Sequence, residues 1–214
     1  MGVCCCRLPW CARLRVGNGV PLQPVLDDYL TESELAAGCQ EQNESLRCSL
    51  KEDALSRASM QSCLDDVVLG RMRKHTDWEQ QSLPQDAIVT PRFSIEQGVR
   101  KDGSVKHRPI DDFTRSRCNS ATIPTERLRY DSLDTFLGAL QQAHGSYEDE
   151  LALFKVDIDA AFRRVPIMPE HRRFAWVGFL LWGRAHAFQH LSMPFGAIAA
   201  VHSWDRIGSM RSTQ

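Results

Sequence analysis

Two aspartates and an aromatic residue stand close together in the segment LFKVDIDAAFRRVPI, residues 153–167. Apolar and polar residues alternate up to Asp157 and Asp159, which is the period of a strand with one apolar and one polar face. Both carboxylates would then point the same way, and Phe162 follows after an Ala-Ala turn. A carboxylate at the end of a strand can bind a hard cation such as Mg²⁺, with substrate phosphates in the coordination shell of the ion. The alternative is a solvated strand face, or a carboxylate that caps the following turn.

The composition is that of a globular chain without an extreme charge. The 214 residues are 43% hydrophobic and 25% charged, and the formal net charge is -1. A nucleic-acid-binding surface would therefore have to come from local clusters of Arg and Lys. No apolar run reaches the roughly 18 residues that a membrane-spanning helix needs, and the start of the chain lacks the apolar core of a secretory signal. We therefore expect an intracellular protein, in the cytoplasm or the nucleus, with reduced cysteines and no membrane partner.

Changes in local composition indicate three regions. Residues 1–30 contain turn formers without periodicity and are expected to be irregular or disordered. Residues 31–80 begin with the capping box Thr31-x-x-Glu34 and continue with polar helix formers, which indicates a helical extension. Residues 81–214 contain short strands and turns, so a domain boundary is predicted near residue 80. The opening Met-Gly followed by cysteines leaves a membrane-tethered adaptor with an acylated N-terminus as an alternative.

Turn signals predict two hairpins in the third region. Asp102-Gly103 separates extended runs at 93–101 and 105–110, and Asp-Gly favours a hairpin because both residues tolerate positive φ. Trp182-Gly183 separates two further runs, at 174–180 and 185–191.

Helical periodicity predicts two helices in the same region. Asp131-Ser132 precedes a helix whose apolar residues recur at i, i+3, i+4 and i+7, and this face is expected to contact the core. An Ala-rich helix is expected from about Ala197. The apolar positions of the first helix are Leu133, Phe136, Leu137 and Leu140.

Three segments resemble motifs of reverse transcriptases, and they occur in the order found in that family. KHRPIDDFTRSRCN (106–119) resembles the fingers segment, and KVDIDAAFRRVPI (155–167) resembles the palm motif that carries the first catalytic aspartate. LSMPFGAIAAVHSW (191–204) resembles the Pro-Phe-Gly motif of retrotransposon polymerases. The resemblance, which spans residues 90–207, implies the N-terminal part of an RNA-directed DNA polymerase of a retrotransposon-like element. It also implies an α+β fold, namely a partial right-hand polymerase fold made of fingers and palm, with antiparallel strands backed by helices.

The resemblance implies roles for individual residues. Asp157 would be the catalytic, metal-binding aspartate, and the backbone carbonyl of Ile158 would be a further metal ligand. Phe162 would be the steric gate that excludes a 2′-hydroxyl, while Asp159 departs from the commonest arrangement and receives no catalytic role. The remaining positions would contact the incoming nucleotide: Arg108, with either Lys101 or Lys106 as a basic partner, and Phe195 and Gly196 in the Pro-Phe-Gly turn.

The implied reaction is template-directed transfer of deoxynucleotides to a primer 3′-hydroxyl. Its cofactor would be Mg²⁺ or Mn²⁺, and its partners would be an RNA or DNA template-primer and dNTP. Reverse transcriptases also carry a second catalytic Asp-Asp pair and a thumb, and neither is recognised here. Because one carboxylate cannot hold two metal ions, we expect that this chain alone does not polymerise.

A second hypothesis is a non-catalytic nucleic-acid-binding remnant of a retroelement. Basic residues outnumber acidic neighbours between 100 and 129, and this excess could follow a template backbone. A solvated charged face explains the same excess.

Overall fold

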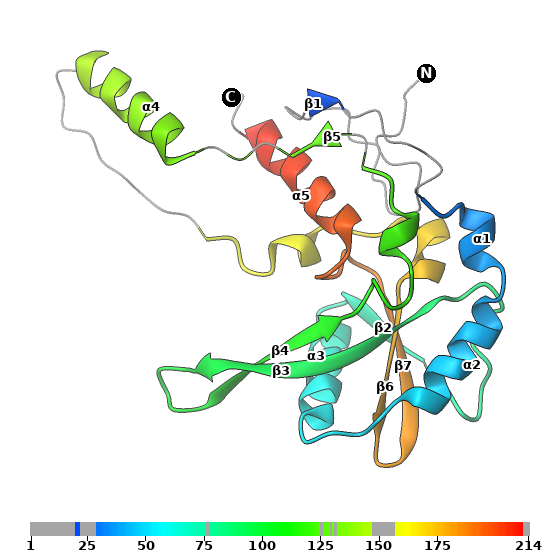
Figure 1. The fold of residues 1–214 in the computed structure, drawn as a ribbon. Helices are drawn as coiled ribbons and strands as arrows, with labels where there is room; N and C mark the ends of the chain where they lie inside the picture. Colours follow the sequence, from blue (N-terminus) through cyan, green and yellow to red (C-terminus); the bar gives the residue numbers. More distant parts are fainter. Residues whose placement is uncertain are drawn as a thin grey trace.

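The structure is a computed structural model that describes residues 20–21, 29–75, 78–124, 126–128, 130, 132–146 and 157–211. Almost all of the predicted irregular region 1–30 lies outside these residues. The helices are α1 (Glu32–Ala36), α2 (Cys39–Ser49), α3 (Ser56–Val68), α4 (Leu133–Ser146) and α5 (Ile198–Arg211), with 3₁₀ turns η2 (Asn119–Ala121), η3 (Ala161–Arg164) and η4 (Pro169–Phe174). The strands are β1 (Val20–Pro21), β2 (Met72–Lys74), β3 (Val89–Val99), β4 (Val105–Asp111), β5 (Glu126–Arg127), β6 (Trp176–Leu181) and β7 (Arg184–His190) (Figure 1).

A five-stranded sheet organises the fold, with the strand order β2-β7-β6-β3-β4. The neighbouring strands are antiparallel except for β3 and β6, which run parallel. The α+β class is therefore confirmed, but the sheet is mixed and not wholly antiparallel as predicted. A parallel pair needs a long crossover, and here the chain between β3 and β6 contains β4, α4 and η3.

Both predicted hairpins form. β3 pairs with β4 around a turn in which Gly103 has φ +83°, and the Ser104 amide donates to Asp102 Oδ1 at 2.9 Å. β6 pairs with β7 around Trp182 and Gly183, which have φ values of +55° and +66°. Two successive positive φ values are typical of the tight turn whose twist matches that of the flanking strands.

Residues 31–74 fold onto the same sheet. The predicted capping box is present, because the Glu34 amide donates to Thr31 Oγ1 at 3.2 Å and the Thr31 amide donates to Glu34 Oε2 at 2.7 Å. β2 pairs with β7 at one edge of the sheet. Leu35 and Cys39 are buried in one core cluster with Phe174. The range predicted as a helical extension thus shares a sheet and a core with the described residues that follow it.

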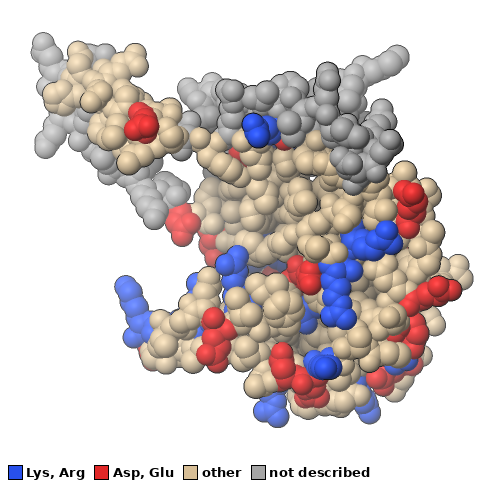
Figure 2. Space-filling view, viewed as in Figure 1, with Lys and Arg blue, Asp and Glu red and all other residues tan. Residues whose placement is uncertain are grey.

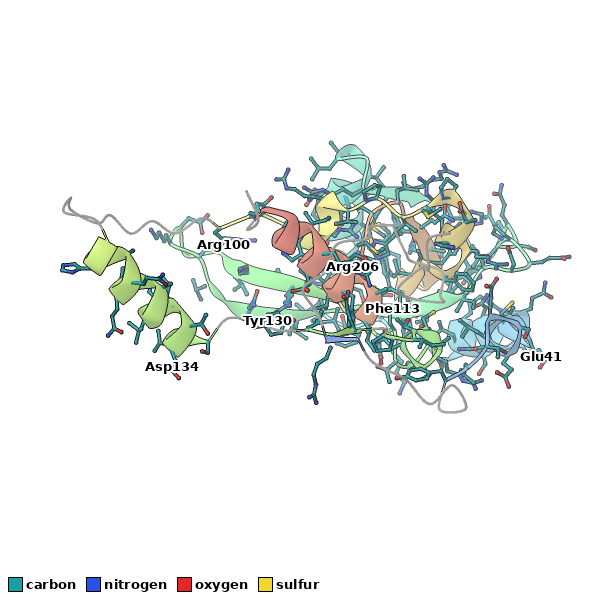
Figure 3. The ribbon with its side chains drawn as sticks, turned by 90° about the horizontal axis from the view of Figure 1, so that it is seen from above. Glu41, Arg100, Phe113, Tyr130, Asp134 and Arg206 are labelled. Carbon is teal, nitrogen blue, oxygen red and sulfur yellow. The ribbon has the colours of Figure 1, made fainter. Side chains whose placement is uncertain are left out.

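Helix α4 forms where it was predicted, but it does not face a core. Ser132 Oγ accepts a hydrogen bond from the Thr135 amide at 3.1 Å, so the predicted start is correct. Leu133, however, is 71% exposed and Phe136 is 48% exposed. Figures 1 and 3 show α4, with Asp134 labelled, standing apart from the body of the molecule. The prediction of a core-facing helix is therefore wrong, because periodicity shows that a face is apolar and not that another element covers it.

The main core cluster gathers residues from all three segments that resemble polymerase motifs. Burial of such side chains removes apolar area from water and fixes the backbone between them. The core members from the three segments include Phe113, Cys118, Val165, Ile167, Met193 and Ala197.

None of the described helices is long and apolar enough to cross a lipid bilayer.

Candidate functional site

Backbone hydrogen bonds hold two of the three segments, 155–167 and 191–204, side by side. The Ile167 amide donates to the Leu191 carbonyl at 2.9 Å, and the Met193 amide donates to the Val165 carbonyl at 2.8 Å. These bonds lie only a few residues from Phe162 on one side and from Phe195 on the other. An isolated antiparallel bridge at Pro166 and Ser192 therefore holds the segments that carry the two aromatic residues beside one another.

Asn119 ties the first segment to the third. Its Nδ2 donates to the Gly196 carbonyl at 3.0 Å, and its Oδ1 accepts from the Ile198 amide at 3.1 Å. The sequence assigned no role to Asn119, although it is the residue that ends the 106–119 segment. Its side chain satisfies two backbone groups at the start of α5, where a helix leaves its first amides without partners inside the helix.

Gly196 could not be replaced at this turn without strain. Its φ is +90°, a conformation that glycine adopts readily and other residues rarely adopt. A Cβ atom here would lie 2.6 Å from the Asp111 carbonyl oxygen. The Pro-Phe-Gly turn therefore packs directly against the end of β4.

An aromatic and cationic surface results from this packing. The rings of Phe162 and Phe195 meet edge to face, with centroids 5.2 Å apart and an interplanar angle of 64°. The guanidinium carbon of Arg108 lies 5.9 Å from the centroid of Phe195, within the range of a cation–π contact. Arg108 and Phe195 are both exposed. We call Arg108, Phe162 and Phe195 the Phe195 surface.

The register of β4 distinguishes the two candidate lysines. Side chains alternate along a strand, so Lys106 lies on the same face of β4 as Arg108. Lys101 instead lies in the turn of the hairpin, whose outer end is marked by Arg100 in Figure 3. Both lysines are exposed, and only Lys106 is placed by the strand beside Arg108.

Asp157 is the first residue described after the gap at 147–156, and its side chain is exposed. The strand predicted to precede it lies outside the described residues, and Ile158 is half-buried. Ala160 has φ +49°, so the chain turns sharply before η3 begins. The Asp159 backbone carbonyl accepts from Arg164 Nε at 3.1 Å.

The metal ligands implied by the resemblance are only partly accounted for. Across the described part of the chain, no group of three or more His, Cys, Asp or Glu side chains is placed to hold a metal ion. Asp157 offers one exposed carboxylate, which suits a Mg²⁺ ion that arrives with a nucleotide and keeps phosphates and waters as ligands.

A network of buried ionic side chains lies beneath this surface, and the sequence did not reveal it. Arg92 donates to both oxygens of Asp111, from Nε at 2.6 Å and from Nη2 at 2.9 Å. His190 Nε2 lies 3.1 Å from Asp111, and His190 Nδ1 lies 2.5 Å from Nη1 of Arg163. Arg163 Nη2 donates to Asp66 at 2.5 Å. This ion network joins α3, β3, β4, η3 and β7.

The partners of His190 fix its protonation. A guanidinium carries only donors, so Nδ1 of His190 must accept and the neutral ring donates from Nε2 to Asp111. Burial and, to a lesser degree, the nearby Arg163 charge lower the pKa of His190 to about 3, against the opposing effect of Asp111. Burial alone would raise the pKa of Asp111, but the Arg92 charge and the hydrogen bonds from His190 and Arg92 hold it well below the ordinary value.

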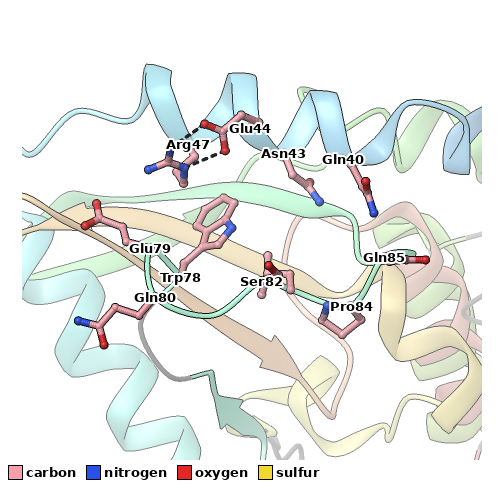
Figure 4. Close-up of a pocket in the computed structure, with 11 residues that line it drawn as sticks. Gln40, Asn43, Glu44, Arg47, Trp78, Glu79, Gln80, Ser82, Pro84 and Gln85 are labelled. Carbon is pink, nitrogen blue, oxygen red and sulfur yellow. Dashed lines mark hydrogen bonds and ion pairs between the residues drawn. The ribbon is translucent and has the colours of Figure 1, made fainter.

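Two cavities differ in their position relative to the Phe195 surface and the ion network, and only the smaller one adjoins them. One of about 170 Å³ lies behind Phe195 and is lined by residues of the ion network. A larger one, about 470 Å³, lies between α2 and the 78–85 loop, where Arg47 pairs with Glu44 at its rim (Figure 4). No residue assigned from the sequence lines the larger cavity. The smaller cavity is therefore the one that belongs to the candidate site.

Comparison with known proteins adds no family to these observations. No protein-family model matches the chain, and no curated protein matches it. Function is therefore inferred from the geometry of the three segments and from their resemblance to polymerase motifs.

Proposed function

We propose that this chain comprises the fingers and part of the palm of an RNA-directed DNA polymerase from a retrotransposon-like element. The chain would bind a deoxynucleoside triphosphate on the Phe195 surface. One observation carries the proposal: Arg108, Phe162 and Phe195 come from three separate segments of the chain and meet at one place. A nucleotide needs a cation for its phosphates and an apolar wall for its sugar, and this surface offers both.

Each side chain has a physical role in this proposal. The planar guanidinium of Arg108 forks onto phosphate oxygens, and the face of Phe195 holds it in position before a nucleotide binds. Lys106 adds a second positive charge on the same face of β4. The ring of Phe162 would meet the sugar and disfavour a 2′-hydroxyl. A Mg²⁺ ion bound through Asp157 would neutralise charge on the phosphates.

Exposed basic residues between 100 and 129 support contact with a template. Asp102 is exposed, but Asp111 and Glu126 are buried and paired with Arg92 and Arg206. On the face that Figure 2 shows, Lys and Arg are interspersed with Asp and Glu, so a template contact on this face would be local. These exposed basic residues also support the second candidate function, a nucleic-acid-binding remnant. The exposed basic residues include Lys101, Lys106, Arg108, Arg115, Arg117 and Arg127.

Replacing Arg108 with Gln is expected to weaken dNTP binding at least about tenfold. Hydrogen bonds between charged groups contribute about 1.5–3 kcal/mol, and each 1.4 kcal/mol changes an affinity about tenfold. Isothermal titration of wild type and Arg108→Gln with dATP in excess Mg²⁺ measures this change.

The matched control is Arg115→Gln, because Arg115 is an exposed arginine of the same segment. Its Nη2 donates to Ser49 Oγ at 2.8 Å, away from the Phe195 surface. The control is expected to bind dATP as wild type does. Equal affinities for wild type and Arg108→Gln would show that nucleotide does not bind here.

A further inference from the structure

The cavity behind Phe195 has room for a small ion. Its volume is about 170 Å³, well above the ~10–15 Å³ that a single water needs by the same kind of measure. It opens between α3, the β3–β4 hairpin and η3, and Phe195 and Ala160 form part of its wall. Its polar lining consists of Ser62, Asp66, Arg71, Arg92, Asp111 and Arg163.

The charges that line this cavity do not balance. Arg92 and Asp111 form a bidentate pair that is neutral as a unit. Asp66 is shared by two arginines, Arg163 at 2.5 Å and Arg71 at 3.8 Å. One positive charge is therefore in excess, since the neighbouring His190 is neutral. A charge shielded from water is costly unless a counter-charge compensates it.

Among the residues that the structure describes, Arg71 is the arginine of this cavity whose donors are free to bind a ligand. Its backbone is fixed, because its carbonyl accepts from the Leu191 amide at 2.8 Å. Its side chain is only 20% exposed, yet its guanidinium makes no hydrogen bond to any other residue that the structure describes. The Ser62 hydroxyl likewise has no hydrogen-bond partner among the described residues. Arg163, in contrast, already donates to Asp66, His190 and the Ser192 carbonyl.

We propose that this cavity binds a small oxyanion of the phosphate type. The Arg71 guanidinium would donate two parallel hydrogen bonds to it, and the Ser62 hydroxyl would donate a third. The anion would supply the missing negative charge and accept the hydrogen bonds that the Arg71 guanidinium and the Ser62 hydroxyl can donate.

The oxyanion site is separate from the proposed nucleotide surface. Pro109 and Asp111 line the cavity, whereas Arg108 lies on the opposite face of β4 because side chains alternate along a strand. The two sites share only Phe195, which forms a wall between them. The inference therefore does not depend on nucleotide binding.

Titration with inorganic phosphate at constant ionic strength tests the oxyanion site. Wild type is expected to show saturable binding, and Arg71→Gln to bind at least about tenfold more weakly. Arg73→Gln is the matched control, because Arg73 is exposed, lies two residues away on β2 and does not line the cavity. Ser62→Ala serves as a second variant and is expected to bind several-fold more weakly, even if Arg71→Gln folds poorly. Absence of saturable binding in wild type, or unchanged affinity in both variants, would overturn the inference.

The same titrations with dATP separate the two proposals. Phosphate binding that survives in Arg108→Gln while dATP binding is lost supports both sites. If wild type binds phosphate but does not bind dATP, the nucleotide site alone is rejected. Binding of dATP without any binding of phosphate rejects the oxyanion site alone.

Discussion

Asp111→Asn is expected to lower the free energy of unfolding by about 3–5 kcal/mol, the usual effect of removing one partner from a buried ion pair. Asn is nearly the same size as Asp, so the change removes a charge and leaves the packing intact. Arg92, at 5% exposure, would keep its positive charge without a counter-charge. His190 would also lose the carboxylate that accepts from its Nε2. Urea denaturation followed by circular dichroism measures the loss.

The neighbouring Asp112→Asn variant is the matched control. Asp112 Oδ1 accepts from the Arg115 amide at 3.0 Å, and an Asn oxygen can accept the same bond. The control is expected to change stability by less than about 0.5 kcal/mol, as surface substitutions usually do. Similar losses for the two variants would show that the Arg92–Asp111 pair does not stabilise the fold in the way described here.

Acidification from pH 7 to pH 4 is expected to destabilise the protein by as much as about 3 kcal/mol through His190 alone. Below pH 6.5 the unfolded chain protonates this histidine, whereas the folded protein keeps it neutral down to about pH 3. The unfolded state then binds more protons, so stability falls as the pH falls. The contribution of Asp111 to stability is lost only at lower pH, because its folded-state pKa lies below the unfolded value of 3.8.

His190→Gln separates this contribution from those of His171 and His202, whose pKa values are also lowered by burial. A Gln side chain can accept from Arg163 and donate to Asp111 without titrating. The variant is expected to lose much of the slope of stability against pH between 6.5 and 4. His144→Gln, at an exposed site on α4, is expected to keep the wild-type slope. A wild-type slope in His190→Gln would place the acid sensitivity elsewhere.

Local signals in the sequence predicted the local structure well. The Asp102-Gly103 and Trp182-Gly183 turns and the Thr31–Glu34 capping box depend on residues at most a few positions apart. Their geometry follows from short-range sterics and hydrogen bonds. Each of these elements is present in the structure.

Long-range features could not be read in the same way. Asp66 and Arg163 are 97 positions apart and Asp111 and His190 are 79 apart, so nothing in their local sequence names their partners. A charged residue inside a strand, such as Arg92 in β3, is a signal for a buried ion pair. It does not identify the carboxylate with which the charge pairs. The parallel pairing of β3 with β6 was missed for the same reason.

The candidate site could be predicted in part from the sequence. The resemblance to polymerase motifs singled out Phe162, Phe195 and Arg108, and the structure brings these three together. The choice between Lys101 and Lys106 needed the register of β4. The strand leading to Asp157 lies outside the described residues, so the position of this carboxylate relative to a nucleotide stays a prediction.

Discrimination between deoxyribonucleotides and ribonucleotides tests the proposed polymerase function most directly. The affinities of dATP and ATP, titrated into wild type and Phe162→Ala in excess Mg²⁺, give this ratio, with the exposed Phe136→Ala on α4 as control. We predict that wild type and Phe136→Ala prefer dATP at least about tenfold, or 1.4 kcal/mol, and that Phe162→Ala binds the two nucleotides nearly equally. Absence of saturable dATP binding in wild type, or a deoxynucleotide preference that survives in Phe162→Ala, would contradict the proposal.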